Sequence, residues 1–298
     1  MTPIELRKGE RYLPSAFLFP GLLFYSVFLI IPLGLTFFAS FTQWEGFSYN
    51  NLRFNGIQNY VDLLKDEIFI KSVKNNFYLI FTCAIFSVLI GFVLSVLLEF
   101  ELPLSKFIRG LYFVPSVMSM IVIGIIFTLF FSPDLGLINP IMKKIGLSRF
   151  AGRWLGDPKK ALGIMASAEV WRTFGFNMFL FVAGMKSLPV EQLEASLLDG
   201  AKKRHIIRYI IIPNLKQVFI VTASLAIINA LKLFDFIYVM TFGGPNHATQ
   251  VMTTWLYFQG FTWNNVGYAS SIGVVLTVLI FVISYFFLRI SGGFKDEN

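Results

Sequence analysis

The sequence predicts an all-α polytopic membrane protein, and three observations lead to this fold class. Of the 298 residues, 56% are hydrophobic, only 14% are charged and 35 are phenylalanine. The mean hydropathy is +0.69, whereas a soluble domain has about 25% charged and about 45–50% apolar residues. The apolar residues gather in continuous runs of the length, about 20 residues, that a helix needs to cross a bilayer. Continuous runs favour helices over a β-barrel, whose strands are shorter and alternate in polarity.

Six runs qualify as transmembrane helices, and polar segments separate them. The first run is too long for the core of a signal peptide and lacks a small-residue cleavage site, so we expect it to be a retained span. Prolines and glycines inside the runs are tolerated, because neighbouring helices can satisfy the backbone groups that they free. The expected spans are Ala16–Phe41, Phe77–Leu98, Leu111–Phe131, Leu162–Met185, Val218–Met240 and Val266–Ile290.

This pattern also predicts the division and the orientation of the chain. We expect an N-terminal segment with the first span and an outer loop (1–70), a core of five spans (71–290) and a short tail (291–298). With the N-terminus inside, Lys and Arg are more numerous in the cytoplasmic segments. The outward-facing ones lie in two long loops, which have little weight in orientation. We therefore expect both termini, and the tail, to be cytoplasmic.

Several function classes find no support in the sequence. The net charge of +8 comes from basic residues scattered over many polar segments, which does not predict nucleic-acid binding. Cys83 is the single cysteine, so no intrachain disulfide can form. No glycine precedes a lysine, which excludes a Walker A phosphate loop. His205 and His247 belong to no zinc motif. We expect no catalytic residues, no metal and no cofactor, and therefore no enzyme.

The residues of the loop between the fourth and fifth expected spans, 187–213, indicate its local structure. Pro189 suits the first position of a helix, and Glu191 and Glu194 follow where the helix dipole favours acids. Gly200 stands where a helix ends with a positive φ. The sequence therefore predicts a short helix over Pro189–Asp199.

The apolar residues of this expected helix form one face, because they are spaced i, i+3, i+7 and i+8. They are Val190, Leu193, Leu197 and Leu198. Such a helix can lie on the bilayer surface or insert into a groove of a partner protein. Physical reasoning alone leaves both possibilities open.

The segment E-A-S-L-L-D-G-A (194–201), followed by Pro213, resembles the EAA loop of ABC importer permeases. In that family the short helix docks into a cleft of the cytoplasmic ATPase and transmits its closure. Ser196 stands where the family usually has a second alanine. The resemblance implies ATPase-coupling roles for Glu194, Ala195, Asp199, Gly200 and Ala201.

Three more segments resemble the sugar-permease branch that includes the maltose and glycerol-3-phosphate permeases. They are F-N-G-I-Q-N-Y (54–60), F-D-F-I-Y-V-M-T-F-G-G-P (234–245) and G-Y-A-S-S (267–271). The G-G-P run is also explained by a turn after a span, and the small residues of 267–271 by helix packing. The resemblance implies a type I ABC importer permease fold in a bacterial inner (plasma) membrane.

What the resemblance implies about function is a binding-protein-dependent importer of a sugar or oligosaccharide. This chain would pair with a second permease, two ATP-binding ATPase subunits and an extracytoplasmic solute-binding protein, and would contact lipid and the sugar. ATP hydrolysis on the separate ATPases would drive alternating access. A charged sugar or a glycerol phosphate derivative is the alternative substrate class.

Two other protein classes are weighed against the importer. Discontinuous helices and internal repeats would favour a free-standing secondary transporter, and the two halves show no convincing repeat. A membrane scaffold or receptor without transport would not explain the charged residues in the fourth and fifth spans.

Charged residues within spans are costly, about 2.5–3.5 kcal/mol each near the bilayer centre. The fourth span contains Glu169 and Arg172, and the fifth contains Lys232 and Asp235. Each pair is spaced i, i+3 and can neutralise itself, so a structural pair and a polar path remain equally open. Alignment with the maltose permease implies substrate positions at Glu169, Arg172, Thr173 and Phe176 and at Ala226, Asn229, Ala230 and Leu233. Their residue types differ from those of the maltose permease, which makes maltose itself a doubtful substrate.

Overall fold

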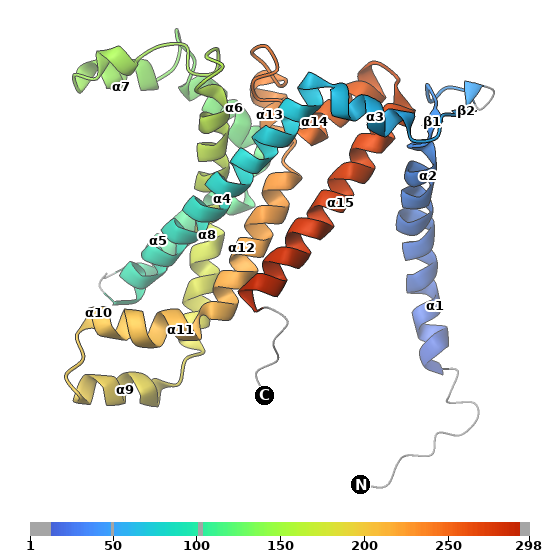
Figure 1. Cartoon of the computed structure of the whole chain (residues 1–298). Helices are drawn as coiled ribbons and strands as arrows, with labels where there is room; N and C mark the ends of the chain where they lie inside the picture. Colours follow the sequence, from blue (N-terminus) through green and yellow to red (C-terminus); the bar gives the residue numbers. More distant parts are fainter. Residues whose placement is uncertain (1–12, 49–50, 101–103, 293–298) are drawn as a thin grey trace. The chain divides into compact units, whose positions relative to one another are not determined.

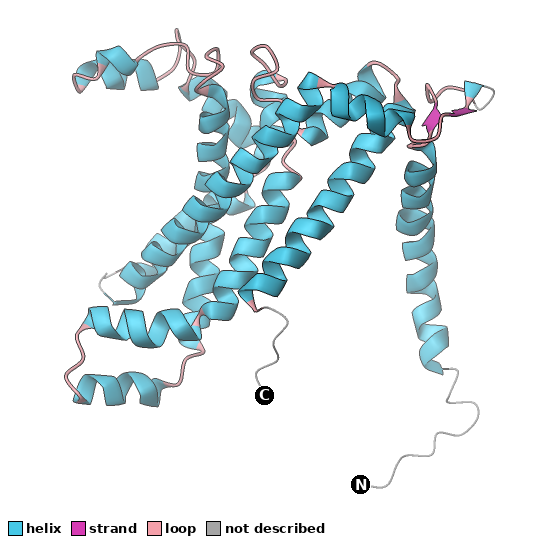
Figure 2. Cartoon of the chain, viewed as in Figure 1, coloured by secondary structure: helices cyan, strands magenta, loops and turns pink. Residues whose placement is uncertain are grey.

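The computed structural model describes residues 13–48, 51–100 and 104–292. Helices dominate, and the strands of the described part form one two-stranded antiparallel ladder (Figure 2). The all-α class is confirmed. The chain divides into two compact units, residues 1–63 with 256–275, and residues 64–255 with 276–298. Helix α15 (Val266–Ser291) runs from the first unit into the second.

The first unit contains the first span, whose helix is continuous but irregular. A π-helical turn, Ser26–Ile30, precedes Pro32, and the Ile31 N–H donates to the Ser26 carbonyl. Because proline has no N–H to donate, the wider turn re-routes the backbone hydrogen bonds around it. The span consists of α1 (Leu13–Tyr25), the π-helical turn and α2 (Ile31–Ala39). The remaining elements of this unit are β1 (Thr42–Gln43), β2 (Arg53–Phe54), α3 (Gln58–Lys65) and η5 (Phe258–Thr262).

The second unit is a helical bundle built on two long helices, α4 (Glu67–Phe100) and α8 (Ala161–Lys186), which pack against each other most extensively. Gly91 of α4 allows this approach, since a Cβ there would lie 2.8 Å from Cβ of Asn177. Gly175 of α8 meets the Tyr112 carbonyl oxygen in the same way. Small residues let membrane helices approach closely. The other helices are α5 (Ser105–Val117), α6 (Met120–Phe130), α7 (Ile138–Lys144), α9 (Val190–Leu198), α10 (Lys203–Ile206), α11 (Ile212–Asn214), α12 (Lys216–Leu231), α13 (Asp235–Thr241) and α14 (Met252–Tyr257), with shorter turns η3 (Ser148–Phe150) and η4 (Ile207–Ile211).

Within the described residues, three single helices have the length and composition of membrane spans: Leu18–Ala39, Glu67–Glu99 and Val266–Ser291. They correspond to the first, second and sixth expected spans. Two bent helix pairs pass the same test together, which raises the number to at most five. Helix α8 corresponds to the fourth expected span. Its 26 residues extend over about 39 Å, but Glu169 and Arg172 lower its hydropathy.

The expectation of continuous third and fifth spans is wrong. Helices α5 and α6 are bent by 97°, because Met118 and Ser119 between them have extended backbone conformations. In the fifth span, α12 ends at Leu231 and α13 begins at Asp235. Such breaks need nearby polar partners, and the Met118 N–H donates to the Pro115 carbonyl oxygen at 3.3 Å.

Helices α7 and α9 lie at opposite ends of the second unit (Figure 1). The chain between them passes through α8. The apolar residues at the α9 end form a cluster of Val88, Phe181, Val182, Met185, Ile206, Ile211 and Leu215.

Candidate translocation and coupling sites

A buried ion pair lies on α8. Nε and Nη2 of Arg172 donate to Oε2 and Oε1 of Glu169 at 2.9 and 2.7 Å. The side chains of Arg172 and Glu169 are 11% and 2% exposed. This two-point geometry is the strong form of an arginine–carboxylate contact. The i, i+3 pairing expected from the sequence is therefore present.

The surroundings of the pair contain further polar and aromatic groups. Asp235 at the start of α13 lies within electrostatic range of Glu169. The buried Cys83 of α4 lies within range of both Glu169 and Arg172. Trp171, which is 39% exposed, packs against Phe127 of α6 with ring centroids 5.8 Å apart. The Glu169–Arg172 pair is therefore covered by other helices on one side, and the partly exposed Trp171 lies next to it.

The other substrate positions implied by the resemblance differ in exposure. Thr173 is half-buried, and its hydroxyl donates to the Glu169 carbonyl of its own helix at 2.7 Å. Phe176 is 39% exposed. Of the four implied positions in and just after α12, Asn229 is exposed, whereas Ala226, Ala230 and Leu233 are buried. The implied α12 positions therefore divide between an exposed edge and a face packed inside the chain.

Lys232 and Asp235 do not form an ion pair with each other in the described part of the chain. Lys232 caps the end of α12 and is exposed, and Asp235 is half-buried at the first position of α13. The break between the helices separates the two residues that a continuous helix would bring onto one face.

The short helix expected in the loop 187–213 is present as α9, one residue shorter at each end. Pro189 precedes it in an extended conformation instead of occupying its first position. Its end has the hydrogen bonds of a Schellman motif: the Ala201 N–H donates to the Ser196 carbonyl and the Gly200 N–H to the Leu197 carbonyl, both at 3.0 Å. Gly200 has a φ of +74°. The D-G-A run thus forms the C-cap of α9.

Helix α9 is anchored to the bundle by few residues. Leu193 and Ala201 pack against the apolar cluster at this end, while Val190, Leu197 and Leu198 are 60%, 62% and 89% exposed. The remaining coupling positions implied by the resemblance, Glu194, Ala195, Asp199 and Gly200, are exposed as well. Exposed apolar residues grouped with polar ones are typical of a protein contact.

Pro213, the last position of the EAA resemblance, shapes the return from this loop. The π-helical turn η4 precedes Pro213, and the Ile212 N–H donates to the Ile207 carbonyl. The first span shows the same arrangement before Pro32. In both places a wide turn replaces the hydrogen bond that proline cannot donate.

The sequence did not indicate how the G-G-P loop is held. Asn75 of α4 donates to the carbonyls of Ala248 and Gln250 at 3.0 and 2.7 Å. Asn76 accepts from the Met252 N–H at 2.9 Å. The two adjacent asparagines in the polar first turns of α4, directly before its apolar run, are the sequence signal for this anchor. The loop is therefore an anchored structure packed on α4.

The G-Y-A-S-S segment begins α15 and packs closely within the first unit. The Gly267 N–H donates to the Trp44 carbonyl at 3.0 Å, and a Cβ at Gly267 would overlap the Thr42 carbonyl oxygen. Ala269, Ser270 and Ser271 are buried. Helix packing therefore accounts for the small residues of this segment.

Long apolar helices, two broken spans, a buried charge pair on the unbroken α8 and an exposed short helix at one end are typical of a polytopic membrane transport protein. The described residues contain no group of three or more His, Cys, Asp or Glu side chains that could hold a metal ion. Residues 87–292 match the model of the family described as "Binding-protein-dependent transport system inner membrane component". The chain belongs to this family, whose function is transport, and the match does not support a free-standing secondary transporter.

Curated relatives are similar over nearly the whole chain. The chain is 32% identical to the probable ABC transporter permease protein YurN of Bacillus subtilis, with 97% of this chain and 99% of YurN covered. It is 29% identical to the arabinooligosaccharides transport system permease protein AraP of Bacillus subtilis, with 99% and 93% covered. It is 29% identical to the trehalose/maltose transport system permease protein MalF of Thermococcus litoralis, with 98% of each chain covered.

A solved structure supports the fold. A chain in the crystal structure of a bacterial ABC transporter that imports the acidic polysaccharide alginate has a TM-score of 0.82 to this chain, at 22% identity and with 96% of each chain covered. The type I importer permease fold implied by the resemblance is confirmed.

Proposed function

We propose that this chain is one permease subunit of an ATP-driven importer for a sugar or oligosaccharide. The observation that carries the proposal is α9, a capped helix whose apolar residues are exposed, in a chain that belongs to a binding-protein-dependent transport family. In this proposal two ATPase subunits dock on α9, a second permease completes the path, and an extracytoplasmic binding protein delivers the substrate.

The names of the relatives support the sugar as substrate class. Arabinooligosaccharides, diacetylchitobiose and trehalose or maltose appear among them. One structural neighbour was solved with an alginate pentasaccharide-bound periplasmic protein. The ion pair on α8 has no net charge, which favours a neutral saccharide over the charged sugar or glycerol phosphate kept as the alternative.

In the proposed path, Glu169, Arg172 and Phe176 of α8 and Asn229 of α12 face the saccharide. Arg172 and Asn229 supply directional hydrogen bonds, and Phe176 supplies packing area. Thr173, Ala226, Ala230 and Leu233 belong to the implied set as well, and their part is to support the neighbouring helices in the occupied state.

The coupling role of α9 is tested by Leu198→Asp. Leu198 is 89% exposed, so this chain folds without its contact, whereas a docked ATPase would bury an unpaired carboxylate at a cost of several kcal/mol. We expect the variant chain to insert normally but to co-purify with less than about a tenth of the wild-type ATPase. Leu135→Asp, at a leucine that is 83% exposed before α7, is the matched control. Unchanged recovery of ATPase with Leu198→Asp would refute the docking of α9.

We also propose that both termini and the α9 end of the second unit face the cytoplasm. Lys143 in α7 and Arg204 in α10 are exposed and precede and follow α8. Single cysteines at these positions are placed in a Cys83→Ser chain. The cysteine at 143 should react with an impermeant maleimide from outside the cell, and the cysteine at 204 from the cytoplasmic side. Reaction of both from outside intact cells would contradict this orientation.

A further inference from the structure

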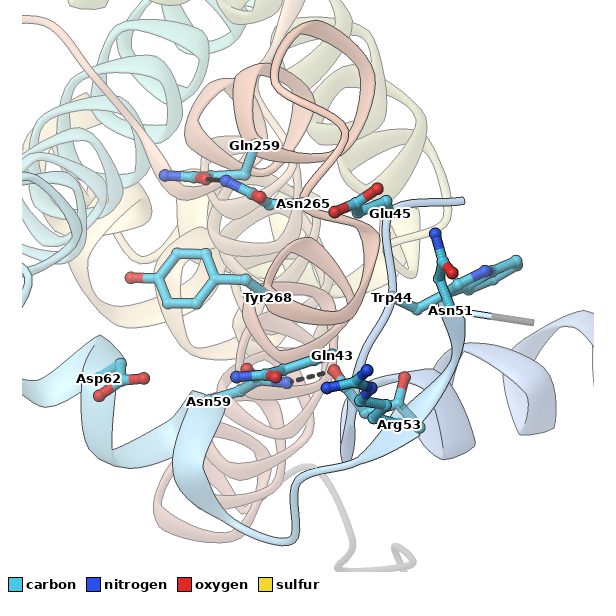
Figure 3. A pocket seen from close by; sticks show the side chains of 11 residues that line it. Gln43, Trp44, Glu45, Asn51, Arg53, Asn59, Asp62, Gln259, Asn265 and Tyr268 are labelled. Carbon is cyan, nitrogen blue, oxygen red and sulfur yellow. Dashed lines mark hydrogen bonds between the residues drawn. The ribbon is translucent and has the colours of Figure 1, made fainter. Parts of the chain in front are cut away.

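A polar pocket of about 740 Å³ lies within the first unit, between the end of the first span and the start of α15 (Figure 3). The volume falls in the range of about 300–1,000 Å³ that is typical of small-molecule sites. Unlike most such sites, this pocket is lined largely by side-chain amides and charged groups. Two segments without a role in the path or in coupling, 54–60 and 267–271, contribute Asn59 and Tyr268 to it.

Two buried amides of the pocket are held by the fold with defined polarity. Both hydrogens of Asn59 Nδ2 are donated to the carbonyls of Ser40 and Thr42, at 2.8 and 2.9 Å. Its Oδ1 is therefore the atom that can accept from a ligand. Gln259 accepts through Oε1 from Asn265 at 3.0 Å, so its Nε2 is the group that can donate. The fold thus presents a fixed acceptor and a fixed donor.

Tyr268 lies between these two amides. In Figure 3 its ring stands between Gln259 and Asn265 on one side and Asn59 on the other. The ring is half-buried and offers a flat apolar surface among hydrogen-bonding groups. A saccharide ring has the matching properties, because its hydroxyls each donate and accept while its C–H face is apolar.

The charges of the pocket select among saccharides. Glu45 and Asp62 provide two carboxylates against the single guanidinium of Arg53. All three side chains are exposed. This excess of negative charge disfavours binding of a uronic acid or a sugar phosphate because like charges repel, most strongly at low salt.

We propose that this pocket of the first unit is a second saccharide site, selective for a neutral sugar unit. The proposal rests on the sugar function proposed above and adds a binding site in the first unit. Tyr268 supports the sugar ring, Asn59 Oδ1 accepts from a hydroxyl, and Gln259 Nε2 donates to another.

The test is saturation-transfer NMR on the whole transporter complex in nanodiscs, without its binding protein and free of sugar-based detergent. The probes are arabinotriose, diacetylchitobiose and trehalose, with trigalacturonate as the acidic comparison. We expect transfer to at least one neutral probe and little to trigalacturonate. Tyr268→Ala should weaken the transfer about tenfold, while Tyr268→Phe should retain it.

Two variants locate the bound probe. Phe261→Ala is the matched control, because Phe261 is an exposed aromatic residue of the same unit that does not line the pocket. Phe176→Ala removes an aromatic residue from the proposed membrane path. Transfer that is lost with Phe176→Ala and kept with Tyr268→Ala would assign the sugar to the path and overturn the pocket.

Uptake by the same complex with its binding protein separates the two proposals. Saccharide uptake without any Tyr268-dependent transfer would overturn the pocket and leave the importer function standing. An absence of uptake for every saccharide would overturn the function, and with it the role of the pocket in sugar transport.

Discussion

Helices α8 and α9 follow each other in the chain but differ in whether their side chains find partners within this chain. On α8, the costly groups are paired internally: Glu169 and Arg172 bind each other, and Asn177 donates to the Ser87 hydroxyl at 3.1 Å. On α9, the apolar residues Leu197 and Leu198 remain exposed. The buried groups of α8 find their partners within this chain, whereas the exposed apolar residues of α9 are those that the proposed ATPase docking would cover.

The energetic consequences of the two arrangements are opposite. A substitution that unpairs a buried group on α8 acts on the folding of this chain. A substitution at an exposed residue of α9 leaves folding nearly unchanged and acts on assembly. Separate measurement of the amount of folded chain and of the assembled, active complex therefore distinguishes the two regions.

The largest expected effect comes from Arg172→Ala. Removing one partner of a buried ion pair typically costs about 3–5 kcal/mol, because the other charge remains buried and unpaired. We expect most of the variant chain to be lost from the membrane. The pair Asp157–Lys160 before α8 is the control, since its side chains are 34% and 42% exposed and Asp157→Asn with Lys160→Gln should cost about 1 kcal/mol or less.

The double variant Glu169→Gln with Arg172→Gln separates folding from transport. Without buried charge, its folded amount should recover to near the wild-type level. If the pair also contacts the saccharide, uptake per assembled complex should stay about ten- to a hundredfold low, because a hydrogen bond to a charged group is worth about 1.5–3 kcal/mol. Near-normal uptake would show that the pair is structural and would remove both residues from the path.

A smaller effect on folding is expected from Gly175→Ala. The added Cβ would overlap the Tyr112 carbonyl oxygen of α5, and backbone cannot move aside as a flexible side chain can. Overpacking of this kind costs about 1–3 kcal/mol. Gly21→Ala in α1 is the control, since its Cβ would meet no atom within 4 Å. Fluorescence-detected gel filtration after heating should show a lower melting temperature for Gly175→Ala alone, and equal melting would refute the close α5–α8 contact.

The features predicted correctly from sequence are those that neighbouring residues determine. The cap of α9 follows from Asp199, Gly200 and Ala201, and the ion pair on α8 from an i, i+3 spacing. The break at Met118–Ser119 was not predicted, because residues far along the chain hold it: the Ser116 hydroxyl donates to the Arg172 carbonyl at 2.9 Å.

Long-range assembly also explains why the pocket of the first unit was missed. Its lining residues extend from Thr42 to Tyr268, and no spacing rule connects such distant positions. In the sequence, Asn59 and Tyr268 stand out only as members of the segments 54–60 and 267–271. The fold brings them together through the start of α15, where Gly267 allows close approach to Thr42.

The smallest expected effect, and the finest test of the contrast between α8 and α9, comes from the cap of α9. Gly200 has a φ of +74° and open space around it, so Gly200→Ala introduces backbone strain but no clash. The cost is about 1 kcal/mol, which corresponds to about a fivefold change in the population of the docking-competent helix. Gly200→Asn is the matched variant, since asparagine adopts the left-handed conformation more readily. We expect saccharide-stimulated ATPase activity to fall about fivefold for Gly200→Ala and less for Gly200→Asn, with the amount of folded chain unchanged for both. A loss of folded chain instead would mean that the bundle depends on the end of α9, and that α9 is as much a part of this chain's own core as α8 is.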